Sequence, residues 1–311
     1  MKTEAIAARK EQRSWTSAAG IQGLGVGAKI TDSEWLSDLV LKVYVVEKLP
    51  ESKLKHSRKV PKRVNIPGLG ELDTDVEAIG RMKVEANTTR VRPAIPGFSV
   101  GHVKITAGTF GCLVHKKGDK NTLYILSNSH VLADSGIAKK GDDEVQPGPY
   151  DGGKVPIDLI AQLTDWVPFK FTARGFPNRV DAAIAAVEAK DSTSAIRLIG
   201  VPKGISTAVK REMQIQKTGR TTDYTIGIVK DVNYRTSLNY KKPGGGRGRV
   251  GFTDQVLCTR YTAGGDSGSA VCNMKGEVVG LHFAGSTSTS VFNKIDNVLT
   301  ALNVALVTWK I

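Results

Sequence analysis

The stretch Gly264-Gly265-Asp266-Ser267-Gly268-Ser269 carries the strongest chemical signal in this chain. Glycines around a serine allow a tight turn, in which the backbone approaches a substrate and successive N–H groups point at one spot. Serine alone is a poor nucleophile, so this interpretation requires a histidine within hydrogen-bond reach and a carboxylate that orients the histidine. The stretch therefore predicts that Ser267 is a nucleophile whose partners lie elsewhere in the chain.

Two upstream segments supply these partners. His130 lies in Ser-Asn-Ser-His-Val, and Asp181 lies in Val-Asp-Ala-Ala-Ile. The order His, Asp, Ser differs from the orders Asp-His-Ser and Ser-Asp-His that other folds use. Each residue alone has a simpler explanation: a glycine-rich turn for Ser267, a capped loop histidine for His130 and a strand-end charge for Asp181. All three in one order favour catalysis.

The composition is that of an ordinary globular protein, with 40% hydrophobic and 24% charged residues. Its 311 residues suffice for two domains, or for one domain with a sizeable extension. No uninterrupted apolar run approaches the roughly 20 residues of a membrane-spanning helix, and residues 1–10 lack the apolar core of a secretion signal. We therefore expect a cytoplasmic protein without a membrane partner.

The cysteines and histidines form no recognisable metal or disulfide pattern. Cys112, Cys258 and Cys272 are too few and too odd in number for a disulfide framework, which agrees with a reducing compartment. The five histidines lack the i, i+4 or Cys-x-x-Cys spacing of zinc sites. We predict no metal and no cofactor.

The formal net charge is +14 at pH 7. A basic balance of this size permits binding to nucleic acid, to an anionic membrane surface or to an acidic protein, and does not choose among them. The densest basic segments, residues 53–63 and 241–249, do not interleave aromatic side chains as a platform for single-stranded nucleic acid would. A solvated surface explains both segments more simply.

Residues 1–95 are predicted to form a small α/β domain of unknown role. Residues 1–18 are polar and alanine-rich, which is typical of a short helix or a frayed end. Alternating glycines in residues 20–30 suggest nucleotide binding, but they do not open a helix after a strand, so a glycine-rich edge strand is favoured. Further elements are strands at residues 39–46 and 73–80 and a helical turn at residues 50–54.

Two prolines and a glycine in residues 90–97 mark a boundary, and residues 96–311 form the second predicted domain. Short apolar strands separated by turn residues predict an all-β sandwich or barrel there. His130 directly follows a predicted hairpin of residues 111–127, and Asp181 begins a predicted strand. Two segments lack this pattern of short strands. Residues 134–156 are predicted to form a long surface loop, and residues 291–306 a C-terminal helix.

With His130, Asp181 and Ser267 in their motifs, residues 105–311 resemble chymotrypsin-like serine endopeptidases. The resemblance implies a mainly β fold, a chymotrypsin-like double β-barrel, to which this chain adds the small N-terminal α/β domain and the C-terminal helix. It implies a protein or peptide substrate. It also implies that His130 is the base for Ser267, that Asp181 orients His130, and that the N–H groups of Gly265 and Ser267 form an oxyanion hole.

The segment Lys217-Thr218-Gly219-Arg220-Thr221-Thr222 resembles the Gly-Arg-Thr-Thr segment of bacterial members of that family. The resemblance implies a pair between Arg220 and Asp266, the residue before the nucleophile. Animal relatives use a cleaved N-terminal ammonium group for this purpose. No matching activation site is found in this sequence, so we expect an enzyme that needs no zymogen cleavage.

The residues expected around the substrate argue against a basic P1 side chain. Tyr261 stands where trypsin-like members carry an acidic group. Thr262 and His282 match positions that glutamyl endopeptidases use to bind a P1 carboxylate, although a lone histidine on an apolar strand also fits a purely structural role. The segment Phe283-Ala284-Gly285 is expected to pair with the substrate backbone as an added strand.

A different class of function is kept as the alternative. The chain is then a non-proteolytic or autoinhibited regulatory binding module, whose basic N-terminal domain contacts nucleic acid or an acidic protein partner. Fold likeness by itself does not establish activity. Binding that collapses between low and moderate salt would favour nucleic acid.

Overall fold

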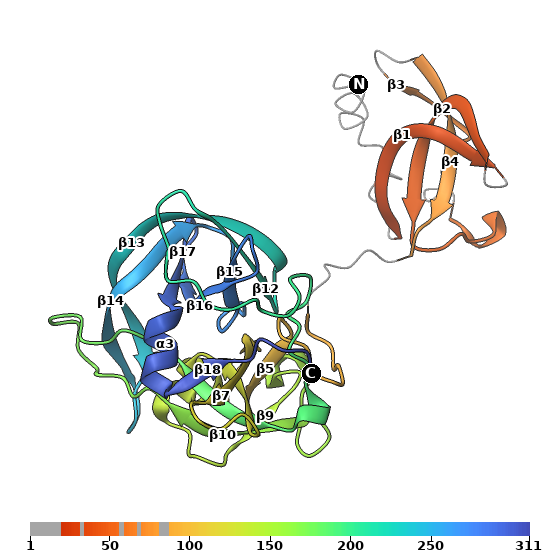
Figure 1. Cartoon of the computed structure of the whole chain (residues 1–311). Helices are drawn as coiled ribbons and strands as arrows, with labels where there is room; N and C mark the ends of the chain where they lie inside the picture. The colour runs from red at the N-terminus through yellow and green to blue at the C-terminus, as the bar shows by residue number, and fades with distance from the viewer. Residues whose placement is uncertain (1–19, 32–33, 56–58, 67–69, 81–86) are drawn as a thin grey trace. The chain divides into compact units, whose positions relative to one another are not determined.

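The computed structural model describes residues 20–31, 34–55, 59–66, 70–80 and 87–311 (Figure 1). Contacts divide the chain into two compact units, Met1–Val84 and Glu85–Ile311. The helix or frayed end expected at residues 1–18 lies outside the described residues. Among those described, no helix has the length and apolar character needed to span a membrane.

The first unit contains a four-stranded mixed sheet in the order β1-β2-β4-β3. Its strands are β1 (Ile21–Thr31), β2 (Glu34–Val45), β3 (Arg63–Ile66) and β4 (Gly70–Ala78). The three strands expected from the sequence overlap β1, β2 and β4 with slightly different bounds, and β3 is additional. The expected helical turn is the single 3-10 turn η1 (Glu51–Lys53). The described part of this unit has no α-helix, so its α/β character stays a prediction.

The second unit begins with a curled eight-stranded sheet in the order β18-β7-β8-β11-β10-β9-β5-β6 (Figure 1). Its strands are β5 (Ser99–His102), β6 (Gly108–Thr109), β7 (Cys112–Lys116), β8 (Leu123–Ser127), β9 (Asp143–Val145), β10 (Leu159–Trp166), β11 (Ala183–Val187) and β18 (Val304–Leu306). Phe110, Leu113 and Ile125 are buried in its core.

A closed barrel follows, in the order β12-β13-β14-β17-β16-β15. Its strands are β12 (Gln214–Gly219), β13 (Asp223–Lys241), β14 (Arg247–Thr259), β15 (Ala270–Asn273), β16 (Val278–Gly285) and β17 (Thr289–Lys294). Ile215, Val271 and Phe292 fill its centre. A curled sheet followed by a closed barrel confirms the predicted mainly β, double-barrel fold.

Alternate side chains of β7 and β8 pack into two different apolar clusters, one inside the first barrel and one between the two barrels. Leu113 faces the core of the first barrel, whereas the neighbouring Cys112 and Val114 belong to a cluster that also contains Cys272 and Leu281 of the second barrel. Successive residues of a strand point to opposite faces, so a strand buried on both faces reads as a continuous apolar run. The interface between the barrels is therefore a second apolar core.

The predicted C-terminal helix is present as α3 (Ile295–Leu302), with narrower bounds than expected. Ile295, Val298, Leu299 and Leu302 form its buried stripe. Asn303 ends the helix with a left-handed φ of 53°, and its N–H bonds to the last-turn carbonyls. The two ends of the predicted helical segment 291–306 are strands instead. Its first residues belong to β17, and its last residues form β18, which completes the sheet against β7.

Two other expectations are corrected. The segment 134–156 is not wholly a surface loop, because strand β9 inside it pairs with β10 and β5, and Glu144 on β9 is fully buried. The predicted domain boundary after residue 95 lies too late. Asn87 donates through Nδ2 to Gly219 O at 3.0 Å, and its N–H bonds to Arg220 O, so residues from Asn87 onward belong to the second unit.

Candidate active site

His130 and Asp181 meet because β8 and β11 are antiparallel neighbours. Ser127, the last residue of β8, is opposite Ala183, the first residue of β11. His130 follows β8 on the one-turn helix α2 (Ser129–Leu132), and Asp181 lies two residues before the start of β11. The sheet register thus places both residues at one edge of the first barrel, although 51 positions separate them in the sequence.

The bonds between the two residues fix the tautomer of the histidine. Asp181 Oδ2 accepts from His130 Nδ1 at 2.5 Å, and Asp181 Oδ1 accepts from the His130 backbone N–H at 3.2 Å. The Asp181 side chain is fully buried, whereas 26% of the His130 side chain is exposed. Since Nδ1 carries the proton bonded to Asp181, Nε2 is the ring nitrogen left to accept a proton.

Three residues that the sequence analysis did not identify hold Asp181 in place. Tyr240 donates its hydroxyl to Asp181 Oδ2 at 2.9 Å. Asp181 N–H donates to Asn293 Oδ1 at 3.0 Å, and Asn128 Nδ2 donates to Asp181 O at 2.7 Å. No local motif marks Tyr240 or Asn293, because both lie on strands of the second barrel and reach Asp181 only after the barrels pack.

Ser267 lies on the turn between β14 and β15, where two glycines are required. Gly265 and Gly268 have φ of 98° and 94°, which non-glycine residues rarely adopt. Space is short as well, because a Cβ on Gly268 would lie 2.0 Å from Ser127 Oγ. The backbone conformation and the lack of space therefore require glycine on both sides of the Asp266-Ser267 pair, which is the pattern that the sequence shows.

This turn abuts the histidine helix. Thr109 N–H donates to Ser267 O at 2.8 Å. A Cβ on Gly108 would lie 2.4 Å from a Val131 methyl group and 2.9 Å from Ser267 O, so only the width of a glycine separates α2 from the serine turn. Within the described residues the Ser267 hydroxyl makes no hydrogen bond. Catalytic hydrogen bonds are often long without substrate and tighten when it binds.

The N–H groups of Gly265 and Ser267 make no hydrogen bond to any described residue. The peptide between Gly264 and Gly265 is held from its other side, because Thr221 Oγ1 donates to Gly264 O at 2.7 Å. In a trans peptide the C=O and N–H groups point in opposite directions. Fixing the Gly264 carbonyl therefore fixes the direction in which the Gly265 N–H points.

The predicted Arg220–Asp266 pair is wrong. Arg220 instead forms a bidentate pair with Asp151, through Nε at 2.6 Å and Nη2 at 2.5 Å. Lys217, fully buried, is the cation beside Asp266, at 3.4 Å from Oδ2. The planar guanidinium matches the two oxygens of Asp151, whereas the point charge of Lys217 fits the enclosed space beneath the serine turn.

Hydrogen bonds complete the shell around Asp266. Its Oδ1 accepts from the N–H groups of Thr221 and Thr222, and its Oδ2 accepts from Thr222 Oγ1 and Ala263 N–H. Burial alone would raise the pKa of Asp266, but the charge of Lys217 and these bonds hold it below its usual value. Burial lowers the pKa of Lys217, against the pull of Asp266. The residue before the serine is thus an anchored carboxylate.

The predicted P1-binding residues lie together and buried. Thr262 Oγ1 is 2.7 Å from Ser290 Oγ, and a Cβ on Gly285 would lie 3.4 Å from Thr262 Oγ1. The rings of Tyr261 and His282 are 5.9 Å apart. His282 Nδ1 and the Tyr261 hydroxyl are buried and have no hydrogen-bond partner among the described residues. Burial lowers the pKa of His282 to about 4, so this histidine is neutral at pH 7.

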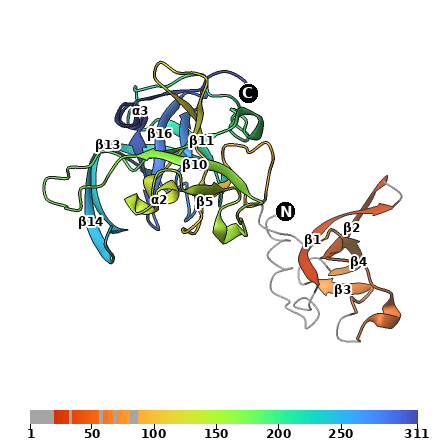
Figure 2. The same ribbon diagram turned by 90° about the horizontal axis from the view of Figure 1, so that it is seen from below.

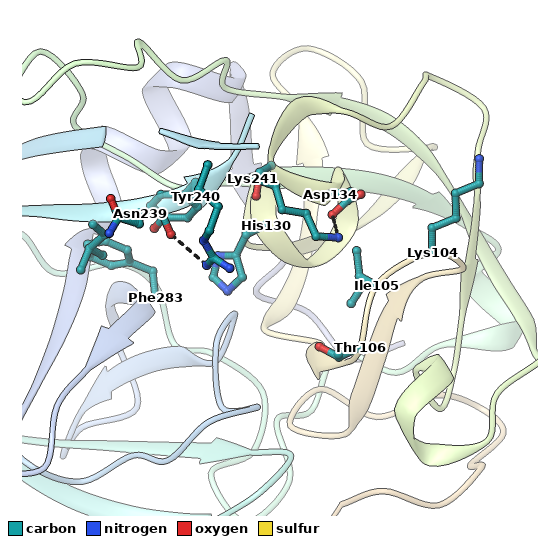
Figure 3. A pocket seen from close by; sticks show the side chains of 12 residues that line it. Lys104, Ile105, Thr106, His130, Asp134, Asn239, Tyr240, Lys241 and Phe283 are labelled. Atoms are coloured by element: carbon teal, nitrogen blue, oxygen red, sulfur yellow. Dashed lines mark hydrogen bonds and ion pairs between the residues drawn. The ribbon is translucent and has the colours of Figure 1, made fainter. Parts of the chain in front are cut away.

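An open cavity of about 620 Å³ borders His130 (Figure 3). Phe283 and the end of β13 line one side of it, and Lys104, Ile105 and Thr106 line the other. Its basic residues are Lys104, Lys241 and Arg247, and Asp134 bonds Lys241 Nζ at 2.9 Å. A peptide lying in this cavity would contact His130 and a mainly basic wall.

Comparisons with known proteins identify one family and several similar solved structures. Residues 103–305 match the trypsin family, and no curated protein matches the chain. Thermobifida fusca Protease A is 14% identical, covering 69% of this chain and 98% of its own, with a TM-score of 0.46. A glutamic acid specific serine protease is 20% identical, covering 69% and 100%, with a TM-score of 0.47. A Cellulomonas bogoriensis chymotrypsin is 15% identical, covering 69% and 98%, with a TM-score of 0.43.

Proposed function

The chain belongs to the trypsin family of serine endopeptidases, and from this premise we propose that it hydrolyses peptide bonds through Ser267, His130 and Asp181. The observation that carries the proposal is the 2.5 Å bond from His130 Nδ1 to buried Asp181, which leaves Nε2 free to accept a proton. The serine turn that packs against α2 and the two unused N–H groups of that turn support it further.

The chemistry follows from these positions. His130 Nε2 takes the Ser267 proton while Oγ attacks the scissile carbonyl carbon, and the oxyanion accepts hydrogen bonds from the N–H groups of Gly265 and Ser267. Asp181 stabilises the imidazolium. His130 then gives the proton to the leaving amine, which leaves an acyl-enzyme on Ser267. Water, deprotonated by the same nitrogen, attacks the ester and releases the acid.

Labelling with a fluorophosphonate tests the proposal without knowledge of the substrate, because the probe forms a covalent bond only with an activated serine. We expect wild-type protein to be labelled, and labelling to be lost in Ser267→Ala and His130→Ala. Ser288→Ala, which removes an exposed hydroxyl from the β16–β17 turn, serves as the control and should label normally. Folded wild-type protein that stays unlabelled, or labelling that survives in Ser267→Ala, would contradict the proposal.

We further propose a preference for an acidic P1 side chain. A carboxylate near His282 would give partners to two buried groups, the Nδ1 of His282 and the Tyr261 hydroxyl, which have none among the described residues. Unsatisfied buried polar groups are costly, so a ligand that pairs with them gains affinity. Thr262, the next residue after Tyr261, has a buried hydroxyl that is already bonded to Ser290 Oγ at 2.7 Å.

Matched peptides that differ only at P1 test this preference. We expect kcat/KM for Glu to exceed that for Ala or Leu, and His282→Ala to lower the Glu value by about 10- to 100-fold, the worth of one hydrogen bond to a charged group. The same variant should leave the Leu value almost unchanged. Cleavage after Ala or Leu as fast as after Glu would overturn the preference while leaving the triad proposal intact.

The edge of β16 suits the proposed strand addition. β15 begins opposite Leu281, so Ala284 and Gly285 pair with β17 on one side only within the described structure, and Phe283 lies at the irregularity in that pairing. An extended peptide can add main-chain hydrogen bonds to such an edge.

We also propose that the enzyme acts in the cytoplasm. Its three cysteines are free and buried, as expected in a reducing compartment, and localisation of the tagged protein tests this.

A further inference from the structure

Tyr240 connects the second barrel to the catalytic carboxylate. Its hydroxyl donates to Asp181 Oδ2 at 2.9 Å, and the same oxygen accepts the bond from His130 Nδ1. The Asp181 side chain is fully buried, and Tyr240 is 8% exposed. The rings of Tyr240 and His130 lie 5.9 Å apart at an interplanar angle of 60°, and Figure 3 shows the two side by side at the cavity wall.

The length of one hairpin brings Tyr240 to this position. β13 has 19 residues, and its pairing with β14 continues to Lys241 and Arg247. Figure 2 shows β14 extending beyond the other strands of the barrel. Tyr240 packs at 4.6 Å from the ring of Phe169 and 5.9 Å from that of Phe252. A shorter hairpin would end before it reached Asp181.

An ion pair fixes the end of this hairpin to the first barrel. Lys241 Nζ bonds Asp134 Oδ1 at 2.9 Å, and Asp134 lies just after the helix that carries His130. The aromatic packing and this pair restrain the tyrosine from two directions. Its hydroxyl is therefore held on Asp181 by the architecture and not by a flexible loop.

We propose that Tyr240 is a positioning residue of the catalytic triad: its hydroxyl completes the hydrogen bonds of Asp181, and it thereby fixes the carboxylate that orients His130. A buried carboxylate requires donors in place of water. Apart from His130, Tyr240 is the one described side chain that donates to the Asp181 carboxylate. This inference rests on the proposed triad.

The tyrosine stays a donor across the working pH range. Burial, followed by the charge of Asp181, raises its pKa well above the usual value. Other charged groups near His130 are Lys104, Asp134, Lys241 and Arg247 in the cavity wall, and none of them bonds Asp181. Removing the Tyr240 hydroxyl leaves more negative charge on Asp181. The bond that Asp181 Oδ2 accepts from His130 Nδ1 then changes, because one of the two donors on that oxygen is gone.

Tyr240→Phe tests the proposal, because it removes the hydroxyl and keeps the ring. The rate constant for fluorophosphonate labelling should fall by about 10- to 100-fold, and the pH profile of labelling should change. The low-field NMR resonance of the His130 Nδ1 proton should shift as well. Tyr234→Phe is the matched control, since Tyr234 is in the same aromatic cluster and makes no hydrogen bond to Asp181.

The outcomes separate this inference from the proposed function. Unlabelled wild-type protein would refute the triad itself. Wild-type protein that labels, with Tyr240→Phe equal to it in rate, pH profile and Nδ1 resonance, would refute the role of Tyr240 alone. A rate loss with an unchanged pH profile and resonance would show a merely structural role and also refute it. If Tyr240→Phe lowered the thermal midpoint markedly, the Nδ1 resonance measured at low temperature would still decide.

Discussion

Asp181 is bonded on both carboxylate oxygens, which accept from His130 Nδ1, His130 N–H and Tyr240. Asp181→Asn keeps the shape but presents an amide N–H where His130 needs an acceptor, so the imidazole adopts the wrong tautomer. The same change in the Ser-His-Asp triad of a well-studied serine protease lowers kcat by about 10⁴. We expect a loss of this order in kcat, with thermal stability close to wild type. A loss of less than about tenfold would exclude the assigned role.

Thr221 holds the peptide whose N–H group belongs to the proposed oxyanion site. Arg220 Nη1 donates to Thr221 Oγ1 at 2.9 Å, and Thr221 Oγ1 donates to Gly264 O. Thr221→Val removes this bond and frees the Gly265 N–H to turn away from substrate. We expect kcat to fall by roughly 10- to 100-fold, less than the 10²–10³ for outright loss of one donor, and KM to change little. Unchanged kcat would show that the turn needs no such support.

Glu144 is a buried carboxyl group whose two oxygens have no partner among the described residues. Burial raises its pKa well above the usual value, and Asp142 and Asp143 raise it further. The folded protein therefore keeps a proton that the unfolded chain loses above about pH 4.3. Stability falls as pH rises from there to the folded pKa, by up to about 1.4 kcal/mol per pH unit.

Glu144→Gln removes this titration. The free energy of unfolding of Glu144→Gln minus that of wild type should be larger at pH 8 than at pH 4, because only the wild type loses stability over this range. The comparison of two pH values cancels any constant cost of the amide. Urea unfolding of both proteins at the two pH values measures the difference, and an equal difference at pH 4 and pH 8 would show that Glu144 is ionised in the folded protein.

At the scale of elements, α3 ends where the chain must turn into β18. Asn303 takes a left-handed backbone there, which asparagine and glycine tolerate better than other residues. We expect Asn303→Ala to lower the free energy of unfolding by about 1 kcal/mol, and Asn303→Gly to lower it less. Thermal or urea unfolding measures both. A larger loss for glycine than for alanine would mean that the asparagine side chain, not its backbone conformation, matters at this position.

At the scale of the whole molecule, the contacts of Asn87, Val91 and Arg92 belong to the second unit. Val91 N–H and Arg92 Nη1 both bond Gln146 Oε1. We expect residues 85–311 alone to fold and to label with fluorophosphonate, whereas a chain that starts at residue 100 should have a lower thermal midpoint. Faster labelling of residues 85–311 than of the full chain would indicate that the first unit inhibits. Failure of residues 85–311 to fold would contradict the division.

The alternative function also belongs to this scale. The formal charge of +14 leaves open a basic first unit that contacts nucleic acid or an acidic protein, and this stays a prediction. Phosphate contacts make affinity fall steeply with salt. Binding of labelled single-stranded and double-stranded DNA at low and moderate salt therefore measures that alternative independently of protease activity.

The sequence by itself determined the features that depend on neighbouring residues. The backbone angles and the short distances at the turn around Ser267 require glycines, so the glycine motif predicted the turn. Alternating and continuous apolar runs likewise predicted the strands, and short motifs predicted His130 and Asp181. In each case a local rule of backbone geometry or of side-chain periodicity leaves its mark within a few residues.

Only the tertiary structure decided which charged and polar groups meet. Asp266 pairs with Lys217 and Arg220 with Asp151, and Tyr240 reaches Asp181 across 59 positions of sequence. Such pairings depend on barrel closure, strand register and the length of the β13–β14 hairpin. By residue type alone, many lysines and arginines of this basic chain could pair with a given carboxylate. The packed fold selects among them, because burial makes geometry decisive for a charged group.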